Sequence, residues 1–474
     1  MTPGGSARGG RAVAPRHLYL HVPFCGARCD YCDFYAVALG RGGASGDGRG
    51  VGSGGARAAL LDRYVAAALR EWELLRERHG VRRLETVFLG GGTPSLLGEE
   101  RLEWLLEPLQ PLLTPRAEVT VETNPEDVTE SYAAWAATRG IRVSLGVQSF
   151  SRRLRQDLGR AGTADPVAAF ERLRAAGVGT TVTAPASVGV GVTLTPSASA
   201  PAAGRPAGVQ MGPGVQSPGF RRGSLSVDLI FGIPGQTMAD LDEELAWIAR
   251  LRPDHVSWYE LSVVPGTVLD ARVALTDAGR LGWDAPELPD AEADAELYRR
   301  VVAGLGRLGY EWYEVSNFAL PGHRCCHNSA IWRGHDYLGV GPAAVGTVTV
   351  APLVDGRGDR AADGRAVVAV RRRDVADVDA WLEALEQGHE PPSEQEALAG
   401  DTVARERLLL AARTGRAVSL ADLGPAIDPQ ALPGLSRAGL VSLAGGTLRV
   451  TRKGRYVANE VCVRLFRDSS FLEA

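Results

Sequence analysis

Residues 18–35 read LYLHVPFCGARCDYCDFY. The stretch opens as an apolar strand and then places Cys25, Cys29 and Cys32 in a CxxxCxxC spacing. Three thiolates on one tight loop can bind three irons of a cubane cluster, which leaves the fourth iron open to an exogenous ligand. Structural zinc takes four ligands, so a zinc site here would have to recruit His21 or a distant cysteine. The spacing therefore indicates a [4Fe–4S] site.

Downstream of this loop, short apolar strands alternate with amphipathic helices. We expect strands at residues 84–90, 117–122, 143–147, 226–231 and 255–261, and helices at 56–79, 99–113, 164–176 and 238–251. Alternation of this kind predicts parallel βαβ units, arranged as an open sheet or a barrel.

The chain of 474 residues is too long for one compact core. We expect a flexible N-terminus at 1–15, a core at 16–346 and a smaller C-terminal domain at 374–474. Residues 40–55 and 179–223 are rich in Gly, Pro, Ala and Ser and are interpreted as disordered insertions in the core. Residues 439–450 resemble a β-hairpin with a Gly-Gly turn, which suggests a helical, winged-helix-like C-terminal domain.

Composition excludes several classes of protein. Hydrophobic residues make up 45% and charged residues 23% of the chain, as in an ordinary globular protein. The formal net charge of −4 gives no support for a nucleic-acid-binding surface. Because no apolar run approaches the length of a membrane span and no secretory signal is evident, we expect a cytoplasmic protein without disulfides.

The cysteine loop resembles that of the radical S-adenosylmethionine (SAM) superfamily. The wider pattern YxHxPFCxxxCxYCDF is similar to the coproporphyrinogen-oxidase-like branch, and in particular to the HemW-type heme chaperones. The resemblance implies an α/β fold with a partial (β/α)6 barrel. It also implies that SAM chelates the open iron of the cluster.

Further motifs match this branch in order: GGGTPS at 90–95, VETNPED at 121–127, SLGVQSF at 144–150, LGR at 158–160 and VDLIFGIPGQ at 227–236. Their polar residues lie near the C-terminal ends of strands, where barrel active sites are built. The glycines of the first motif could let backbone amides form a small anion-binding nest. The resemblance assigns SAM binding to Tyr19, Tyr31, Gly91, Gly92, Thr93, Glu122, Gln148, Arg160 and Asp228.

Two local features favour a chaperone over an oxidase. The oxygen-independent coproporphyrinogen III oxidase carries a further cysteine two residues after the third ligand, where this chain has Phe34. His327 to Trp332, read as HNSAIW, resemble the HNxxYW motif associated with heme binding in the chaperones, although Ile331 replaces the tyrosine. His327 is thus a candidate heme ligand, since histidine is a common axial ligand, and Trp332 could pack on the porphyrin. The alternative is that His327 and Asn328 only hydrogen-bond the neighbouring loop.

The sequence therefore predicts a heme chaperone with a [4Fe–4S] cluster, SAM and heme as its cofactors. Its partners would be heme-accepting proteins, with respiratory enzymes among the candidates. The first alternative is the oxidase, which removes carboxylates from propionate side chains by radical chemistry. A radical-SAM enzyme acting on RNA is a third class, against which the lack of excess basic charge argues.

Overall fold

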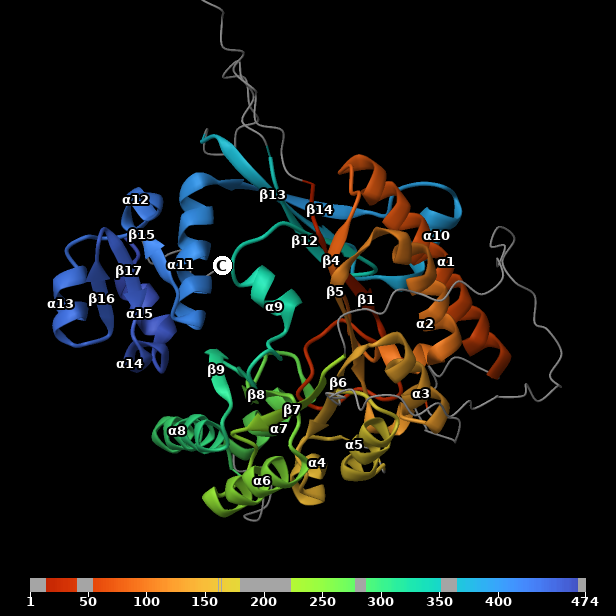
Figure 1. Cartoon of the computed structure of the whole chain (residues 1–474), viewed down its shortest axis with the longest axis horizontal. Coiled ribbons are helices and arrows are strands. Elements are labelled where there is room, and N and C mark those ends of the chain that lie inside the picture. The colour runs from red at the N-terminus through yellow and green to blue at the C-terminus, as the bar shows by residue number, and fades with distance from the viewer. Residues whose placement is uncertain are drawn as a thin grey trace, which may run out of the picture.

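The computed structural model describes residues 14–40, 54–160, 162, 164–179, 223–277, 287–350 and 365–467. Within them the chain forms a large α/β unit around a mixed sheet of 12 strands, with a smaller unit at the C-terminal end (Figure 1). The flexible N-terminus and the two insertions expected from composition lie almost entirely outside the described residues. No helix in the described ranges is long and apolar enough to cross a membrane.

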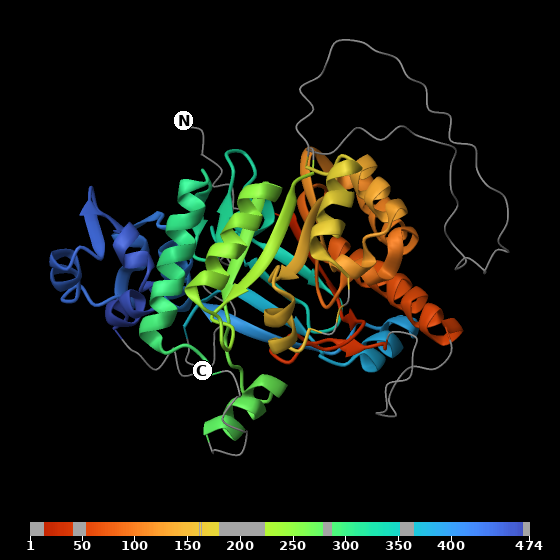
Figure 2. The ribbon, with the colours of Figure 1, turned by 90° about the horizontal axis from the view of Figure 1, so that it is seen from below.

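Six parallel strands follow one another in chain order through the middle of the sheet. They are β1 (His17–Val22), β4 (Leu84–Gly91), β5 (Leu113–Thr123), β6 (Arg142–Gln148), β7 (Leu225–Phe231) and β8 (His255–Glu260). The intervening helices are α1 (Gly54–Arg78), α2 (Gly98–Leu106), α3 (Glu130–Arg139), α4 (Arg152–Asp157), α5 (Pro166–Ala175) and α6 (Met238–Leu251). These helices cover the outer face of the sheet (Figures 1 and 2). The partial (β/α)6 arrangement is confirmed.

The strands form where apolar side chains recur at every second position and are buried on one face of the sheet. Val87 and Leu89 of β4 are fully buried, and so are Val143 and Leu145 of β6. One expected helix is wrong in extent: the periodicity over 99–113 breaks at Leu106, and residues 107–112 form a 3-10 helix. Prolines at positions 108 and 111 of that stretch cannot donate the backbone hydrogen bonds of an α-helix.

The sheet continues beyond the parallel strands on both sides. β11 (Tyr337–Val340) pairs in parallel with β1, and β12 (Val345–Thr349), β13 (Val367–Asp374) and β14 (Ser393–Ala399) follow it in antiparallel order. Beyond β8 lie β10 (Asn317–Ala319) and β9 (Glu311–Glu314). α7 (Val268–Asp277) and α8 (Ala291–Arg307) precede these two strands. The short helix α9 (Cys326–Ile331) lies on the inner side of the curved sheet (Figure 1).

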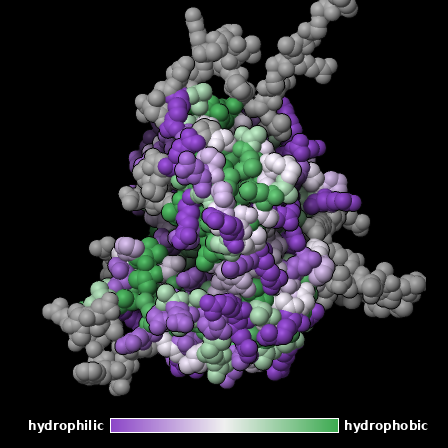
Figure 3. Space-filling model, turned by 90° about the vertical axis from the view of Figure 1, so that its left-hand side faces the viewer, coloured by the Kyte–Doolittle hydropathy of each residue, from purple (hydrophilic) through white to green (hydrophobic). Residues whose placement is uncertain are grey.

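The C-terminal unit has a hydrophobic core of its own, which runs from Leu408 to Phe466. It contains α11 (Gly400–Thr414), α12 (Leu420–Leu423), α13 (Leu432–Arg437), α14 (Arg452–Arg455) and α15 (Ala458–Leu465), with a sheet of β15 (Ala417–Ser419), β17 (Thr447–Val450) and β16 (Val441–Ala444). The last two strands form the predicted hairpin, and Gly445 and Gly446 both have positive φ at its turn. Figure 3 views the molecule from the left-hand side of Figure 1, where the C-terminal unit lies. Hydrophilic residues predominate on this side, with groups of hydrophobic residues between them.

The segment between the two cores belongs to the larger one. α10 (Val378–Glu386) packs against α1, and its Trp381, Leu382 and Leu385 are part of the main core. We therefore propose that the smaller domain begins at α11 rather than at residue 374, because α10 packs in the larger core and β14 pairs with β13 of the large sheet.

Candidate cluster and cofactor site

The three loop cysteines line one cavity of about 460 Å³ at the C-terminal ends of the parallel strands. Cys25 ends the short strand β2 (Phe24–Cys25), which pairs with β3 (Val37–Ala38), and Cys29 and Cys32 lie on the loop between them. The loop is closed by backbone hydrogen bonds from Leu39 N to Cys25 O (2.9 Å) and from Cys32 N to Cys29 O (3.2 Å). All three thiols are partly exposed and thus accessible from the cavity.

His21 shapes this loop and does not face it as a free ligand. Its Nε2 lies 3.0 Å from the carbonyl oxygen of Tyr35, and its Nδ1 lies 3.0 Å from the hydroxyl of Tyr19. Both ring nitrogens are therefore engaged, which argues against a zinc site completed by this histidine. Among the described residues, no three His, Cys, Asp or Glu side chains converge on one point as a single metal ion would require. A cubane does not need such convergence, because each of its cysteines binds a different iron.

The glycine segment after β4 is tightly packed, and the predicted anion nest is wrong for its amides. Gly91 N donates to Glu122 Oε2 (3.1 Å), Gly92 N to Val22 O (2.8 Å) and Thr93 N to Phe24 O (2.7 Å), so these amides already have protein acceptors. A Cβ on Gly91 would lie 2.4 Å from the His21 ring, and a Cβ on Gly92 would lie 2.6 Å from the Phe24 carbonyl oxygen. The glycines allow β4 to pack against the cluster loop while still lining the cavity.

Two partly buried carboxylates lie on the cavity wall: Glu122 near the end of β5 and Asp228 in the middle of β7. Burial and the nearby Asp228 raise the pKa of Glu122 to about 8. Burial also raises the pKa of Asp228. Ser144 Oγ acts against this rise, because it donates to the two carboxylate oxygens at 3.0 and 2.8 Å. An acidic pair in this setting suits an ammonium group or ribose hydroxyls.

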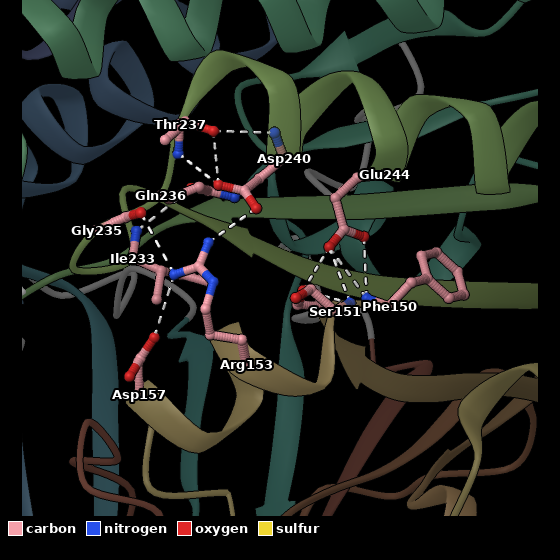
Figure 4. A network of polar contacts seen from close by, with 11 residues as sticks. Phe150, Ser151, Arg153, Asp157, Ile233, Gly235, Gln236, Thr237, Asp240 and Glu244 are labelled. Carbon is pink, nitrogen blue, oxygen red and sulfur yellow. Dashed lines mark hydrogen bonds and ion pairs between the residues drawn. The ribbon is translucent and has the colours of Figure 1, made fainter.

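Gln148 enters the cavity through a strained turn. Its φ of 64° is unusual for a residue other than glycine, and the β6–β7 register shifts at this point. Such conformations cost about 1–3 kcal/mol and persist where the surroundings impose them. Here the next residues are held by Glu244 of α6, which accepts hydrogen bonds from Phe150 N (3.1 and 3.0 Å) and from Ser151 N (3.5 Å) (Figure 4).

A second contact fixes the loops that follow β6 and β7. Arg153 of α4 donates to Asp240 Oδ1 of α6 (2.8 Å) and also pairs with Asp157 (Figure 4). Asp240 in turn forms a capping box with Thr237 at the start of α6. These contacts fix the loops that follow β6 and β7, and the pairing of the two strands places Gln148 and Asp228 close together.

Arg160 joins the cavity wall to the cluster loop. Its Nη2 donates to Asn124 Oδ1 and to the Gly146 carbonyl oxygen, both at 2.7 Å, and its Nη1 lies 3.9 Å from Cys29 Sγ. Asn124 also donates from Nδ2 to Thr93 Oγ1 (3.0 Å). Sequence reasoning missed Asn124, although it lies two residues after Glu122 in a motif that had been singled out.

Eight of the nine side chains and glycines assigned to SAM line this cavity: Tyr31, Gly91, Gly92, Thr93, Glu122, Gln148, Arg160 and Asp228. Tyr19 does not line it and instead contacts His21. The donor set fits a cluster and SAM, because three thiols, two carboxylates, an amide and a guanidinium line the same cavity. Phe34, at the position where the oxidase has cysteine, is 61% exposed beside the thiols.

The residues predicted for heme lie elsewhere. His327 is buried on α9, and its Nδ1 lies 2.8 Å from Thr86 Oγ1 of β4. It lines neither the cluster cavity nor a second cavity at the opposite ends of the strands. Trp332, at the end of α9, stacks under the Arg413 guanidinium of α11 at 4.6 Å. In this conformation His327 hydrogen-bonds β4, whereas the alternative weighed from the sequence placed its partner in the neighbouring loop.

Comparison with known proteins agrees with this geometry. The model of the Radical SAM superfamily matches residues 19–193, and membership implies a [4Fe–4S] cluster and SAM. A curated heme chaperone HemW from Mycobacterium tuberculosis is 32% identical over 94% of this chain and 94% of its own length. The heme chaperone HemW from Escherichia coli is 30% identical over 73% of this chain and 72% of its own.

Among solved structures, coproporphyrinogen III oxidase (HemN) from Escherichia coli superposes with a TM-score of 0.67. The match covers 96% of this chain and 90% of the oxidase at 18% identity, so it shows a shared fold. Fold, cysteine loop and sequence identity together place the chain in the HemW family of the radical SAM superfamily.

Proposed function

We propose that the protein is a heme chaperone, which binds heme and passes it to acceptor proteins. The observation that carries the proposal is the identity of 32% over nearly the whole length to a protein named as a heme chaperone. Phe34 in place of the oxidase cysteine supports the same function. Respiratory enzymes are the acceptors that we propose.

Cys25, Cys29 and Cys32 would hold the cluster, and the cavity beside them would hold SAM. A reduced cluster with bound SAM can supply a 5′-deoxyadenosyl radical. Arg160 would orient the SAM carboxylate, because its guanidinium is already fixed by Asn124 and Gly146. Glu122 and Asp228 would take the ammonium group and the ribose hydroxyls. The cavity volume of about 460 Å³ lies in the range of small-molecule sites.

Anaerobically reconstituted protein tests the proposal in two parallel assays. We expect about one heme per chain by titration of the Soret band, and transfer of that heme to a heme-free acceptor. We expect no conversion of coproporphyrinogen III to protoporphyrinogen IX. Robust SAM-dependent decarboxylation would show that the oxidase is the correct function, and failure to bind heme would exclude a chaperone.

A further inference from the structure

A second cavity, of about 810 Å³, lies at the opposite ends of the strands from the cluster. It is lined by the first residues of β1, β4 and β5 and by the segment around α9. α9 separates the two cavities: Cys325 and Asn328 line the cluster cavity, whereas Cys326 and Ala330 line the second one. The second cavity is large enough for a cofactor-sized ligand.

The walls of this second cavity are strongly basic. Four arginines line it, Arg83, Arg116, Arg324 and Arg333, and the one carboxylate among the described lining residues is Glu85. Glu85 is paired with Arg16 at 2.8 Å, and Arg324 is paired with Glu311 outside the cavity. Arg116 and Arg333 are exposed, and no ion pair to a described residue is found for either of them. The cavity therefore suits a ligand with more than one negative charge.

The imidazole of His335 lines the same cavity, and a series of hydrogen bonds connects it to three further side chains. His335 Nδ1 lies 3.4 Å from His17 Nε2, His17 Nδ1 lies 3.0 Å from Thr86 Oγ1, and Thr86 Oγ1 lies 2.8 Å from His327 Nδ1. The rings of His335 and His17 are nearly parallel, with centroids 5.5 Å apart. No hydrogen bond to a described residue is found for Nε2 of His335, which is an exposed residue lining the cavity.

This arrangement has the form of a metal-binding histidine with its supporting contacts. A ligating histidine donates its other ring N–H to an acceptor, which fixes the ring and its tautomer. The hydrogen bonds of this series can run in either direction. Iron bound at His335 Nε2 would select the direction in which His335 Nδ1–H donates to His17 Nε2. The His17 Nδ1–H then donates to Thr86, and the Thr86 hydroxyl donates to His327. The buried His327 thus ends the series of hydrogen bonds that positions the exposed His335.

We propose that this second cavity binds heme, with His335 Nε2 as the axial ligand of the iron and with Arg116 and Arg333 as partners of the two propionates. His327 is a positioning residue at the far end of this series of hydrogen bonds. A dianionic metalloporphyrin matches the cavity because it carries two carboxylates and a metal that takes imidazole. Pro115 and Ala330 add apolar wall for the ring. This site rests on the proposed heme chaperone function, which it makes specific.

Heme titration of the cluster-loaded protein tests the site. His335→Ala should weaken ferric heme binding about tenfold or more and change the Soret and low-spin spectra, with added imidazole restoring the ligation. Arg116→Ala with Arg333→Ala should weaken binding about tenfold while leaving the spectrum unchanged, because the ligand stays. The double variant should not change binding of heme dimethyl ester, which has no free propionates. His389→Ala and Arg449→Ala, exposed changes elsewhere, are the matched controls.

The absorption spectrum of bound heme distinguishes the role of His327 from that of His335. His327→Ala should weaken binding but keep the histidine-ligated spectrum, since the iron ligand remains in place. Iron content and the unfolding midpoint show whether each variant is folded. Wild-type protein that binds no heme would refute the chaperone function itself. Heme binding that is unaffected by both the His335 and the double arginine change would refute this site alone, and loss of ligation in His327→Ala with retention in His335→Ala would reverse the two roles.

Discussion

At the residue scale, we expect the cluster to depend on the three thiols of the loop. Cys325 is buried at the start of α9 and Cys462 is buried in the C-terminal core. We expect the combined change of Cys25, Cys29 and Cys32 to Ala to abolish the Fe–S absorbance and the roughly four irons per chain. Single Ala changes at Cys325, Cys326 and Cys462 should leave iron content unchanged. Retention of the cluster in the triple variant would show that the ligands are wrong.

Gly91 and Gly98 form a matched pair for the packing around this loop. Both have positive φ, 108° and 76°, but a Cβ on Gly91 would collide with the His21 ring whereas a Cβ on Gly98 meets nothing within 4 Å. Gly98→Ala should cost about 1–3 kcal/mol of unfolding free energy from backbone strain alone, because its ψ of 161° lies outside the left-handed helical region. Gly91→Ala should cost more and also reduce iron content, because the loop must move. Denaturant unfolding with iron analysis measures both, and equal losses in the two variants would contradict the packing argument.

Protonation of His327 should make the free energy of unfolding depend on pH. Burial lowers its pKa to about 3, below the 6.5 of the unfolded chain. The unfolded state therefore binds the proton more readily, and the stability present above pH 6.5 is lost as the pH falls towards 3. Between pH 7 and pH 5 the wild type should lose about 2 kcal/mol more than His327→Gln. Urea unfolding at the two pH values measures this, with the exposed His389→Gln as control. Equal losses of unfolding free energy in the wild type and His327→Gln would contradict a role of His327 in the pH dependence.

At the element scale, α9 is anchored by one buried carboxylate. Glu118 Oε1 of β5 accepts from Cys326 N (2.7 Å) and His327 N (3.2 Å), which satisfies the first amides of the helix. Its other oxygen lies 3.9 Å from Arg142, whose side chain is also buried. Sequence reasoning did not single out either residue, because neither lies in a recognisable motif.

Removing that anchor should displace α9. Glu118→Ala should cost about 3–5 kcal/mol, because it removes the carboxylate that pairs with the buried Arg142 charge and frees the amides of α9. Glu386→Ala, which removes an exposed pair with Arg63, should cost under about 1 kcal/mol. Thermal or denaturant unfolding compares the two variants. Hydrogen exchange should rise at residues 326–331 in the first variant only, and unchanged protection there would show that the helix is held by other contacts.

At the scale of the whole molecule, the stack on Arg413 is one of several contacts that join the two units, and Arg455 over Trp312 is another. Arg413 of α11 lies over Trp332 and pairs at 2.8 Å with Glu314, which is completely buried at the end of β9. Arg413→Gln should expose the C-terminal unit to local unfolding, because the buried Glu314 loses its cation. Faster proteolysis or hydrogen exchange in residues 408–466 is the expected result. Arg464→Gln, an exposed pair on α15, should change neither, and equal behaviour of the two variants would mean that the units are joined by other contacts.

The sequence alone determined the features that depend on short spacing. The cysteine loop, the buried strands and the Gly-Gly hairpin turn could be predicted because ligand spacing, apolar runs and positive φ are properties of a few consecutive residues. Helix α6 was predicted at its observed bounds, Met238–Leu251, since its cap and apolar period agree.

Only the tertiary structure decided which distant residues meet. Thr86 and His327 are separated by 241 positions and yet share a hydrogen bond, and β11 pairs with β1 at the other end of the chain. The same applies to the amides of Gly91–Thr93, whose acceptors Glu122, Val22 and Phe24 lie on three other strands. Such contacts follow from how the sheet curves around α9, and this curvature depends on packing over the whole core rather than on any local pattern. For this reason the sequence could name His327, but only the fold shows it buried behind His17 and His335.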